Sequence, residues 1–194
     1  MTEVFRDRWL LVIDKPAGLA SQAPREGGDN VYDTLAKVEP YVALHHRLDA
    51  AASGLLLLGL DKGVNVALAE AFRTHAIERT YLAVACGEVR DGAWERKVEG
   101  KDARTLVEVL GRGGGRSALR LRLETGRKHQ IRVHAALAGV PLLGDKVYGG
   151  DPAPRLALHA SGLAFVHPVT SEAVTLSSPL PPELVRPWAA AGGP

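Results

Sequence analysis

Two histidines, an arginine and an aspartate stand together just before an apolar run, in a pattern that can perform chemistry. Residues 45–49 read His-His-Arg-Leu-Asp, and the run Leu55-Leu56-Leu57-Leu58 follows shortly after. The run predicts a buried strand, so Asp49 is expected at the edge of the core, where loss of water disfavours a charged carboxylate unless a cation compensates. The pattern allows either a catalytic carboxylate or a turn salt bridge in which Arg47 or another arginine neutralises Asp49.

A second polar cluster occupies residues 123–134, which read Leu-Glu-Thr-Gly-Arg-Lys-His-Gln-Ile-Arg-Val-His. It predicts a basic strand that passes through a glycine turn into a helix whose first turns carry Lys128, His129 and Arg132. Helix N-termini bind phosphate well, but cations at that end oppose the helix dipole. Such local conflict is more typical of functional sites than of idle surfaces. The cluster indicates either a phosphate-binding site or an ordinary exposed basic helix.

Several other chemistries find no matching pattern. The chain has seven histidines but one cysteine, and His129 and His134 are not spaced to bind zinc from one helix face. No phosphate-binding loop, dinucleotide-binding loop or Gly-x-Ser-x-Gly elbow occurs. A glycosidase needs two acids that flank one bond. Glu124 is the candidate partner for Asp49 in that reading, but its charged neighbours in the sequence are basic and do not form a second acid site.

Positive charge is concentrated in one segment, although the net charge of the chain is only +2. Residues 112–132 hold seven basic residues against one acid, Glu124, a local charge of +6. The basic residues are Arg112, Arg116, Arg120, Arg122, Arg127, Lys128 and Arg132. This segment is either a solvated basic face or a surface that follows phosphates.

Strand signals dominate the rest of the chain. The segment Ser117–Glu124 alternates, with leucines on one face and Arg120 and Arg122 on the other, and Gly113–Gly115 before it predicts a hairpin tip. Other strands are expected at residues 9–13, 55–60, 80–85, 105–110, 156–166 and 173–176. Together with fewer helices, they predict an α+β fold with a largely antiparallel sheet.

Four helices are expected around this sheet. Asn30 predicts an N-cap for a helix that runs through Val38, and Asp61 predicts one for residues 62–75. In the second of these helices, Val64, Leu68 and Phe72 are spaced to share one face. Residues 128–138, with Ile131, Ala135 and Ala138 facing inward, and residues 183–190 complete the set.

Length and composition predict one domain that spans residues 1–194, with no metal or disulfide needed to build its core. The lone Cys86 cannot form an internal disulfide, which favours a reducing cytoplasm. The first eight residues are too charged for a signal peptide, and no apolar run approaches membrane-spanning length.

Several motifs together resemble one family. The segment His46-Arg47-Leu48-Asp49, with Ser53-Gly54-Leu55-Leu56-Leu57, resembles the signature of the RluA-type RNA pseudouridine synthases. The Asp-Lys-Pro-Ala-Gly-Leu at residues 14–19 looks like the family's opening turn, and residues 79–84 like its Lys-x-Tyr-x-Ala-x-Val strand. Further matches in the family's order are residues 125–134, 144–149 and 158–160. The resemblance covers roughly residues 9 to 180.

The resemblance implies a pseudouridine synthase fold, a mixed sheet with flanking helices and a central cleft, and no cofactor. By motif, Asp49 corresponds to the catalytic aspartate, Tyr81 to the tyrosine that stacks on the target base, and Arg132 to the arginine that pairs with the aspartate. The implied partner is transfer or ribosomal RNA, bound by a monomer. RNA contacts are expected from Arg47, His46, Arg120, Arg122, Arg127, Lys128 and His129.

Two departures from the family pattern stand out. Ala51-Ala52 replaces the usual Asp-Thr pair beside Asp49, so the rigidity of the turn is in question. The small N-terminal RNA-binding domain of many relatives is also not found, so the catalytic domain itself is expected to choose the RNA. The rival reading is a non-catalytic RNA-binding protein of the same fold. The motif matches at Asp49, Tyr81 and Arg132 favour the enzyme.

Overall fold

The computed structural model describes residues 1–23 and 27–194. The chain divides into two compact units. The first contains Met1–Glu78 and Gly162–Ser178, and the second contains Arg79–Ser161 and Pro179–Pro194. That residues 1–194 act as one catalytic domain stays a prediction.

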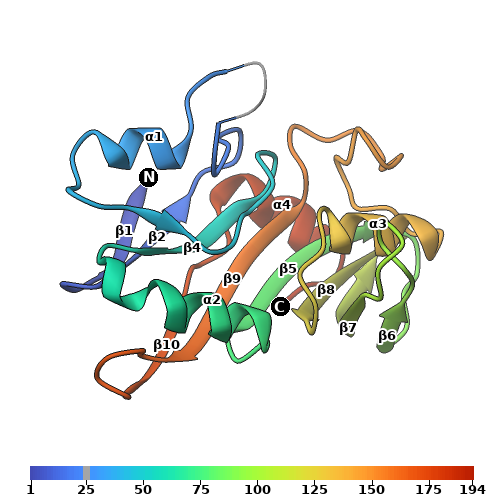
Figure 1. Ribbon diagram of the computed structural model, residues 1–194. Helices are drawn as coiled ribbons and strands as arrows, with labels where there is room; N and C mark the ends of the chain where they lie inside the picture. The colour runs from blue at the N-terminus through green and yellow to red at the C-terminus, as the bar shows by residue number, and fades with distance from the viewer. Residues whose placement is uncertain (24–26) are drawn as a thin grey trace. The chain divides into compact units, whose positions relative to one another are not determined.

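The first unit is built on a small antiparallel sheet (Figure 1). Strand β2 (Leu10–Lys15) lies between β1 (Thr2–Arg6) and β4 (Ser53–Gly59), and the two-residue β3 (Ala43–Leu44) pairs with β4. Every residue of β4 is buried, as the apolar run predicts. Strand β10 (Ala173–Ser177) pairs with the end of β9 (Leu158–Val166).

The helices of this unit begin at the predicted caps. The Asn30 side chain accepts a hydrogen bond from the Asp33 N–H at the start of α1 (Val31–Ala36). Asp61 caps a single 3₁₀ turn, Lys62–Val64, and α2 (Asn65–Arg73) begins only after it. The predicted helix over residues 62–75 is therefore shorter and starts in a tighter turn.

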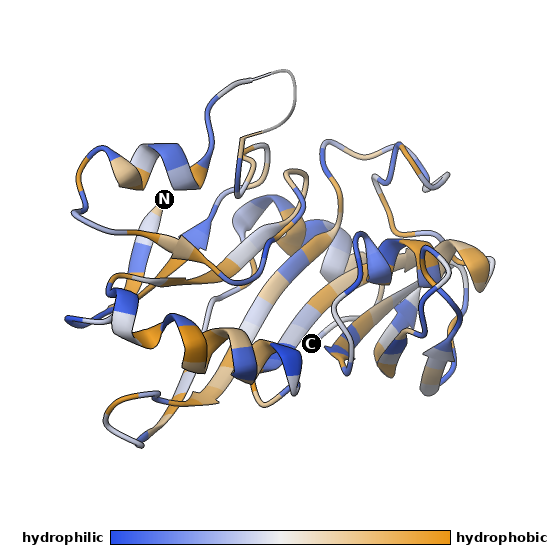
Figure 2. Ribbon diagram, in the orientation of Figure 1, coloured by the Kyte–Doolittle hydropathy of each residue, from blue (hydrophilic) through white to orange (hydrophobic). Residues whose placement is uncertain are grey.

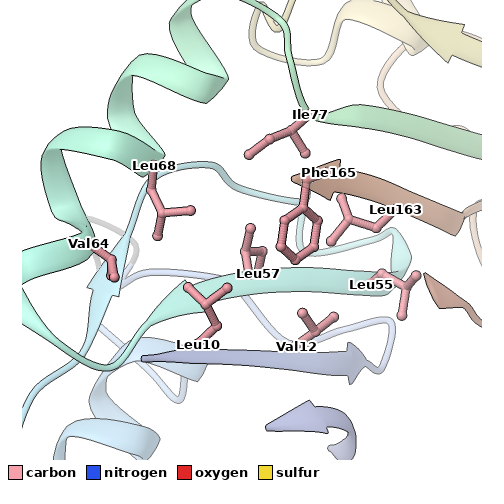
Figure 3. Packing of buried hydrophobic residues seen from close by; sticks show 9 residues of the cluster. All are labelled: Leu10, Val12, Leu55, Leu57, Val64, Leu68, Ile77, Leu163 and Phe165. Atoms are coloured by element: carbon pink, nitrogen blue, oxygen red, sulfur yellow. The ribbon is translucent and has the colours of Figure 1, made fainter. Parts of the chain in front are cut away.

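A leucine-rich core fills the space between α2 and the strands of the first unit (Figure 3). Val64 and Leu68 point toward the strands, and Phe72 packs against the same cluster, which confirms the predicted shared face. The remaining core residues are Leu10, Val12, Leu55, Leu57, Ile77, Leu163 and Phe165. This packing fixes β4, and with it the turn that precedes β4.

The second unit contains an antiparallel sheet in the order β5-β8-β7-β6. The strands are β5 (Glu78–Cys86), β6 (Gly92–Glu95), β7 (Arg104–Gly113) and β8 (Arg116–Leu123). Gly114 and Gly115 form the predicted hairpin tip, and both have positive φ. Hydrophilic arginines interrupt the hydrophobic residues of β8, and Figure 2 shows the hydropathy of the strands by colour.

Two helices cover opposite faces of the second unit's sheet. Helix α3 (Gln130–Leu137) reaches Thr105 of β7 through the side chains of Gln130 and His134. Helix α4 (Pro182–Ala190) packs Leu184 and Trp188 against Ala118 of β8. Thr105 shares a face with Val109 of β7 and with its partner Leu119 of β8. Ala118 is the neighbour of Leu119 along β8, so it points to the opposite face. In α3, Ile131 and Ala135 are buried as predicted, whereas Ala138 is exposed and caps the helix end.

These elements confirm the predicted α+β class with a largely antiparallel sheet. The pairings within each unit, as given above, run antiparallel. The central cleft that the resemblance implies stays a prediction. Within the described part of the chain, no helix has the length and apolar character needed to cross a bilayer.

Candidate active site

Asp49 lies in a short turn that leads directly into β4. The N–H of Ala52 donates to the carbonyl of Asp49 over 3.1 Å, which closes the turn. Leu48 before it is buried, Asp49 is half-buried, and Arg47 is exposed. No carboxylate pairs with Arg47 within the described part of the chain. The turn thus sets Asp49 at the border between the core of the first unit and solvent.

The ammonium group of Lys15 binds this turn from inside the protein. Lys15 ends β2 and is fully buried. Its Nζ donates to the carbonyls of Ala52 over 2.6 Å and of Leu19 over 2.7 Å, and lies 2.9 Å from the carbonyl of Pro16 and 3.5 Å from that of Ala50. The N–H of Gly18 also donates to the Ala50 carbonyl over 2.7 Å. Backbone carbonyls that Lys15 holds therefore brace the turn where Ala51-Ala52 replaces the family's polar pair.

Ser21 and His46 fix the chain on the other side of Asp49. The Ser21 hydroxyl accepts from the N–H of Leu48 over 3.0 Å and donates to its carbonyl over 2.9 Å. The His46 Nε2 accepts from the N–H of Leu57 in β4 over 2.9 Å, and its ring stacks on Phe72 with centroids 4.6 Å apart. Because Nε2 accepts, a neutral His46 carries its proton on Nδ1. These contacts show His46 to be part of the turn's support.

In the second unit, Tyr81 and α3 lie on the same face of the sheet. Tyr81 of β5 pairs with Leu121 of β8, and Leu121 pairs with Val107 of β7, so these three side chains share one face of the sheet. Thr105 lies two residues before Val107 in β7 and therefore points to the same face. Thr105 is the residue that α3 contacts, so Tyr81 and the helix that carries Arg132 share this face. The side chain of Tyr81 is buried.

Arg120 and Arg122 lie on the other face, because they alternate with Leu121 along β8. The structure therefore does not bring these two predicted RNA-binding residues together with Tyr81. They are exposed on the side of the sheet that α4 covers in part.

A buried polar network holds the segment that precedes α3. The Gln130 Oε1 accepts from the Thr125 hydroxyl over 2.7 Å and from the N–H of Arg127 over 3.0 Å. The Gln130 Nε2 donates to the Arg104 carbonyl and to the Thr105 hydroxyl, both over 3.0 Å. This network fixes residues 125–130, the TGR loop. Arg127 and Lys128 in this loop are exposed.

His134 continues the network across β7. Its Nδ1 lies 2.9 Å from the Thr105 hydroxyl, and its Nε2 lies 2.9 Å from the carbonyl of Arg96. A carbonyl only accepts, so Nε2 carries the proton and the neutral Nδ1 accepts from Thr105. His134 is thus a structural residue of the motif.

Arg132 is buried in α3 and forms a two-pronged ion pair with Asp145. The Nε and Nη2 of Arg132 lie 2.8 and 2.9 Å from the two carboxylate oxygens of Asp145. Burial alone would raise the pKa of Asp145, but Arg132 and the backbone N–H groups of Tyr148 and Val147 lower it. Asp145 is a site residue that the sequence reasoning did not assign, although it lies in the matched segment 144–149. The predicted pairing of Arg132 with Asp49 stays a prediction.

Acids from elsewhere in the chain pair with three of the seven cations in residues 112–132. Arg120 pairs with Glu108 of β7 over 2.9 Å, and Arg116 lies 3.6 Å from Asp151. Arg112 instead donates to the Val89 carbonyl, and Arg127 donates to the Asp102 carbonyl. Among the described residues, Arg122, Arg127 and Lys128 have no carboxylate within ion-pair distance. Of these three, Arg127 and Lys128 lie on the TGR loop.

Comparison with known proteins identifies the family. The family model described as RNA pseudouridylate synthase matches residues 9–137. The chain is 33% identical to the Dual-specificity RNA pseudouridine synthase RluA of Haemophilus ducreyi, over 92% of each chain. It is 32% identical to the Ribosomal large subunit pseudouridine synthase D of Xanthomonas campestris, over 94% of this chain and 67% of that protein.

Solved structures agree with this result. The structure of Human RNA Pseudouridylate Synthase Domain Containing 1 matches 95% of this chain and 86% of its own with a TM-score of 0.76 at 26% identity. That of Human RNA Pseudouridylate Synthase Domain Containing 4 covers 98% of this chain and 93% of its own with a TM-score of 0.80. At 24% identity, this second match shows the fold alone.

Proposed function

Because this chain belongs to the RNA pseudouridylate synthase family, whose reaction converts uridine in RNA to pseudouridine, we propose that Asp49 is its essential carboxylate. Tyr81 then stacks against the target base, and Arg132 acts as the counter-ion of Asp49. The observation that carries the proposal is the shared sheet face of Tyr81 and α3, which holds a buried, two-pronged Arg132.

The reaction needs these residue types. The C1′–N1 bond of uridine breaks, the uracil turns, and a C1′–C5 bond forms. The hydrogen at C5 leaves and N1 gains one, so the product is an isomer of the substrate. A carboxylate can assist this step as a nucleophile or base, and a counter-ion keeps it charged in a partly buried site. The aromatic face of Tyr81 offers a surface on which the detached uracil can turn. The uridine must first leave its stack.

The exposed cations near Asp49 and on the sheet face of Tyr81 have the RNA-binding role in this proposal. Arg47 lies two residues before Asp49, and Arg127 and Lys128 lie on the TGR loop on the side of the sheet that carries Tyr81. We assign phosphate contacts to these three. His46 and His129 support them from within, because both rings are held by neighbouring side chains or backbone. Arg120 and Arg122 contact RNA only if the RNA extends to the opposite face of the sheet.

The substrate in this proposal is transfer RNA or ribosomal RNA, bound by a monomer in the cytoplasm. The named relatives support both RNA classes, since one is described as dual-specificity and another as a ribosomal large subunit enzyme. Sequencing of modified sites in transfer and ribosomal RNA, from cells with and without the gene, assigns the uridine.

Tritium release from RNA labelled at uridine C5 tests the role of Asp49. Wild-type protein is expected to release tritium, and Asp49→Asn to fall to background while it keeps its fold and its RNA affinity. Asp29→Asn is the matched control, since Asp29 is exposed and the same charge is removed. Release that persists in Asp49→Asn would sink the assignment. RNA binding by wild type without any release would favour the non-catalytic rival.

A further inference from the structure

Asp145 holds the guanidinium of Arg132 along its edge. Two parallel hydrogen bonds of 2.8 and 2.9 Å join Nε and Nη2 to the two carboxylate oxygens. The side chain of Arg132 is 6% exposed, and that of Asp145 is fully buried. A fork-to-fork pair of this kind fixes the plane of the guanidinium as well as its position.

Asp145 is itself fixed by the backbone around it. One of its carboxylate oxygens accepts from the N–H of Val147 over 3.0 Å and of Tyr148 over 3.1 Å. Gly144 before it has φ of +77°, and a Cβ there would lie 2.0 Å from the carbonyl oxygen of Arg155. The turn at Gly144–Asp145 therefore packs against neighbouring backbone and cannot shift without disturbing it.

Tyr148 covers the face of the same guanidinium. The Cζ of Arg132 lies 5.1 Å from the centroid of the Tyr148 ring, within the range of a cation–π contact. The Tyr148 hydroxyl lies 3.1 Å from Nδ1 of His129, and the two rings meet edge to face at 86°. His129 stands at the N-cap of α3 with φ of +54°, a conformation uncommon for a residue with a side chain.

We propose that Asp145 and Tyr148 are positioning residues for Arg132. Asp145 fixes the guanidinium from its edge, Tyr148 fixes it from its face, and the edge-to-face contact with His129 holds the Tyr148 ring. The proposal rests on the role of Arg132 as counter-ion of Asp49. A guanidinium held from two sides keeps one orientation, so its remaining N–H donors point in a constant direction toward a second carboxylate.

Tyr148 gives the cleaner test, because it is half-buried and its variants are expected to fold. In Tyr148→Leu the ring is lost, and kcat for tritium release is expected to fall about 10-fold or more, since small misplacement of a positioned group is costly. KM for RNA is expected to change less than about 2-fold, because Tyr148 does not contact RNA in this proposal. Tyr148→Phe keeps the ring and is expected to restore most of kcat.

Tyr32→Leu is the matched control, since Tyr32 is exposed on α1 and outside this cluster. Nitrogen NMR of the Arg132 Nε–H adds a readout of orientation. Its signal is expected to be sharp and slow to exchange in wild type and Tyr148→Phe, and broadened in Tyr148→Leu. A purely structural role would lower the unfolding temperature of Tyr148→Leu and leave kcat of the folded fraction and the Nε–H signal unchanged, which would overturn the proposal.

Asp49→Asn, measured in the same experiment, separates the two proposals. If Asp49→Asn is inactive and Tyr148→Leu is as active as wild type, the role of Asp49 stands and the positioning role fails. If Asp49→Asn remains active, the proposed function of the site fails first. A kcat loss in Tyr148→Leu that Tyr148→Phe does not recover would also count against the ring contact as the cause.

Discussion

At the scale of single residues, Lys15 shows how a buried cation can brace the backbone of a turn that carries an acidic residue. The carbonyls of Pro16, Leu19 and Ala52 lie within 3.0 Å of its ammonium group. A buried ammonium needs such acceptors, because burial without hydrogen bonds is strongly unfavourable. The same contacts join the end of β2 to the turn before β4, so Lys15 restricts the movement of the turn that carries Asp49.

Replacing Lys15 by methionine is expected to weaken both the fold and the reaction. The methionine keeps the apolar stem but leaves the buried carbonyl of Ala52 and the part-buried carbonyls of Pro16 and Leu19 without this donor, so the free energy of unfolding should fall by roughly 2–3 kcal/mol. The kcat should fall as well, because the turn of Asp49 loses its fixed position. Urea unfolding and tritium release measure the two effects.

Lys37→Met is the control for this substitution, since Lys37 is exposed and its change is expected to stay within about 0.5 kcal/mol. Equal stability of Lys15→Met and wild type would show that the turn is held by other contacts.

At the scale of elements, the TGR loop is held by one glutamine. Gln130 uses both ends of its amide for four hydrogen bonds, to Thr125, Arg127, Arg104 and Thr105. It is the first residue of α3, so the same side chain links β7 to the helix. A matching donor and acceptor at this point explains why the motif carries an amide where an acid or an alkyl chain would leave groups unpaired.

Gln130→Leu should therefore loosen the TGR loop. The buried Thr105 hydroxyl and the three part-buried partners of the amide lose their hydrogen bonds, and the free energy of unfolding is expected to fall by about 2–3 kcal/mol. Limited trypsin digestion reads the local effect, because cleavage after Arg127 and Lys128 should become faster. Gln22→Leu changes the only other glutamine, which is exposed, and should digest like wild type. An unchanged cleavage rate at the TGR loop in Gln130→Leu would contradict this account.

At the scale of the whole molecule, acids distant in the sequence pair with part of the basic segment. The net charge is +2, and the acids Glu108, Asp145 and Asp151 pair with arginines of the basic segment. Three phosphate contacts, by Arg47, Arg127 and Lys128, remain in the proposed function. RNA affinity is then expected to depend only moderately on salt.

With three contacts, log affinity should fall with log salt at a slope of about −2, taking roughly −0.7 per contact for single-stranded RNA. The double variant Arg127→Ala/Lys128→Ala should reduce the slope to about −0.7. Arg120→Ala/Arg122→Ala removes the same charge from the opposite face and should leave the slope unchanged. A reduced slope in this second variant would mean that RNA reaches both faces of the sheet.

Features that depend on neighbours along the chain could be predicted from the sequence. The caps at Asn30 and Asp61, the glycine hairpin tip before β8, and the alternation along β8 follow from local backbone and side-chain preferences. The motif around Asp49 pointed to the family by residue order alone, and the comparisons confirm that family. The edge strands β1 and β6 were not predicted, because short exposed strands carry little apolar pattern.

Only the tertiary structure decided which charges meet. The RNA contact expected of Arg120 and Arg122 stays a prediction, and the register of β8 with β5 and β7 places both on the face opposite Tyr81 and pairs Arg120 with Glu108. Arg132 is held by Asp145, and the turn of Asp49 by Lys15, across separations that no sequence pattern specifies. Ion pairs and hydrogen bonds act over a few ångströms in space, so their partners are fixed by strand register and packing rather than by position in the chain.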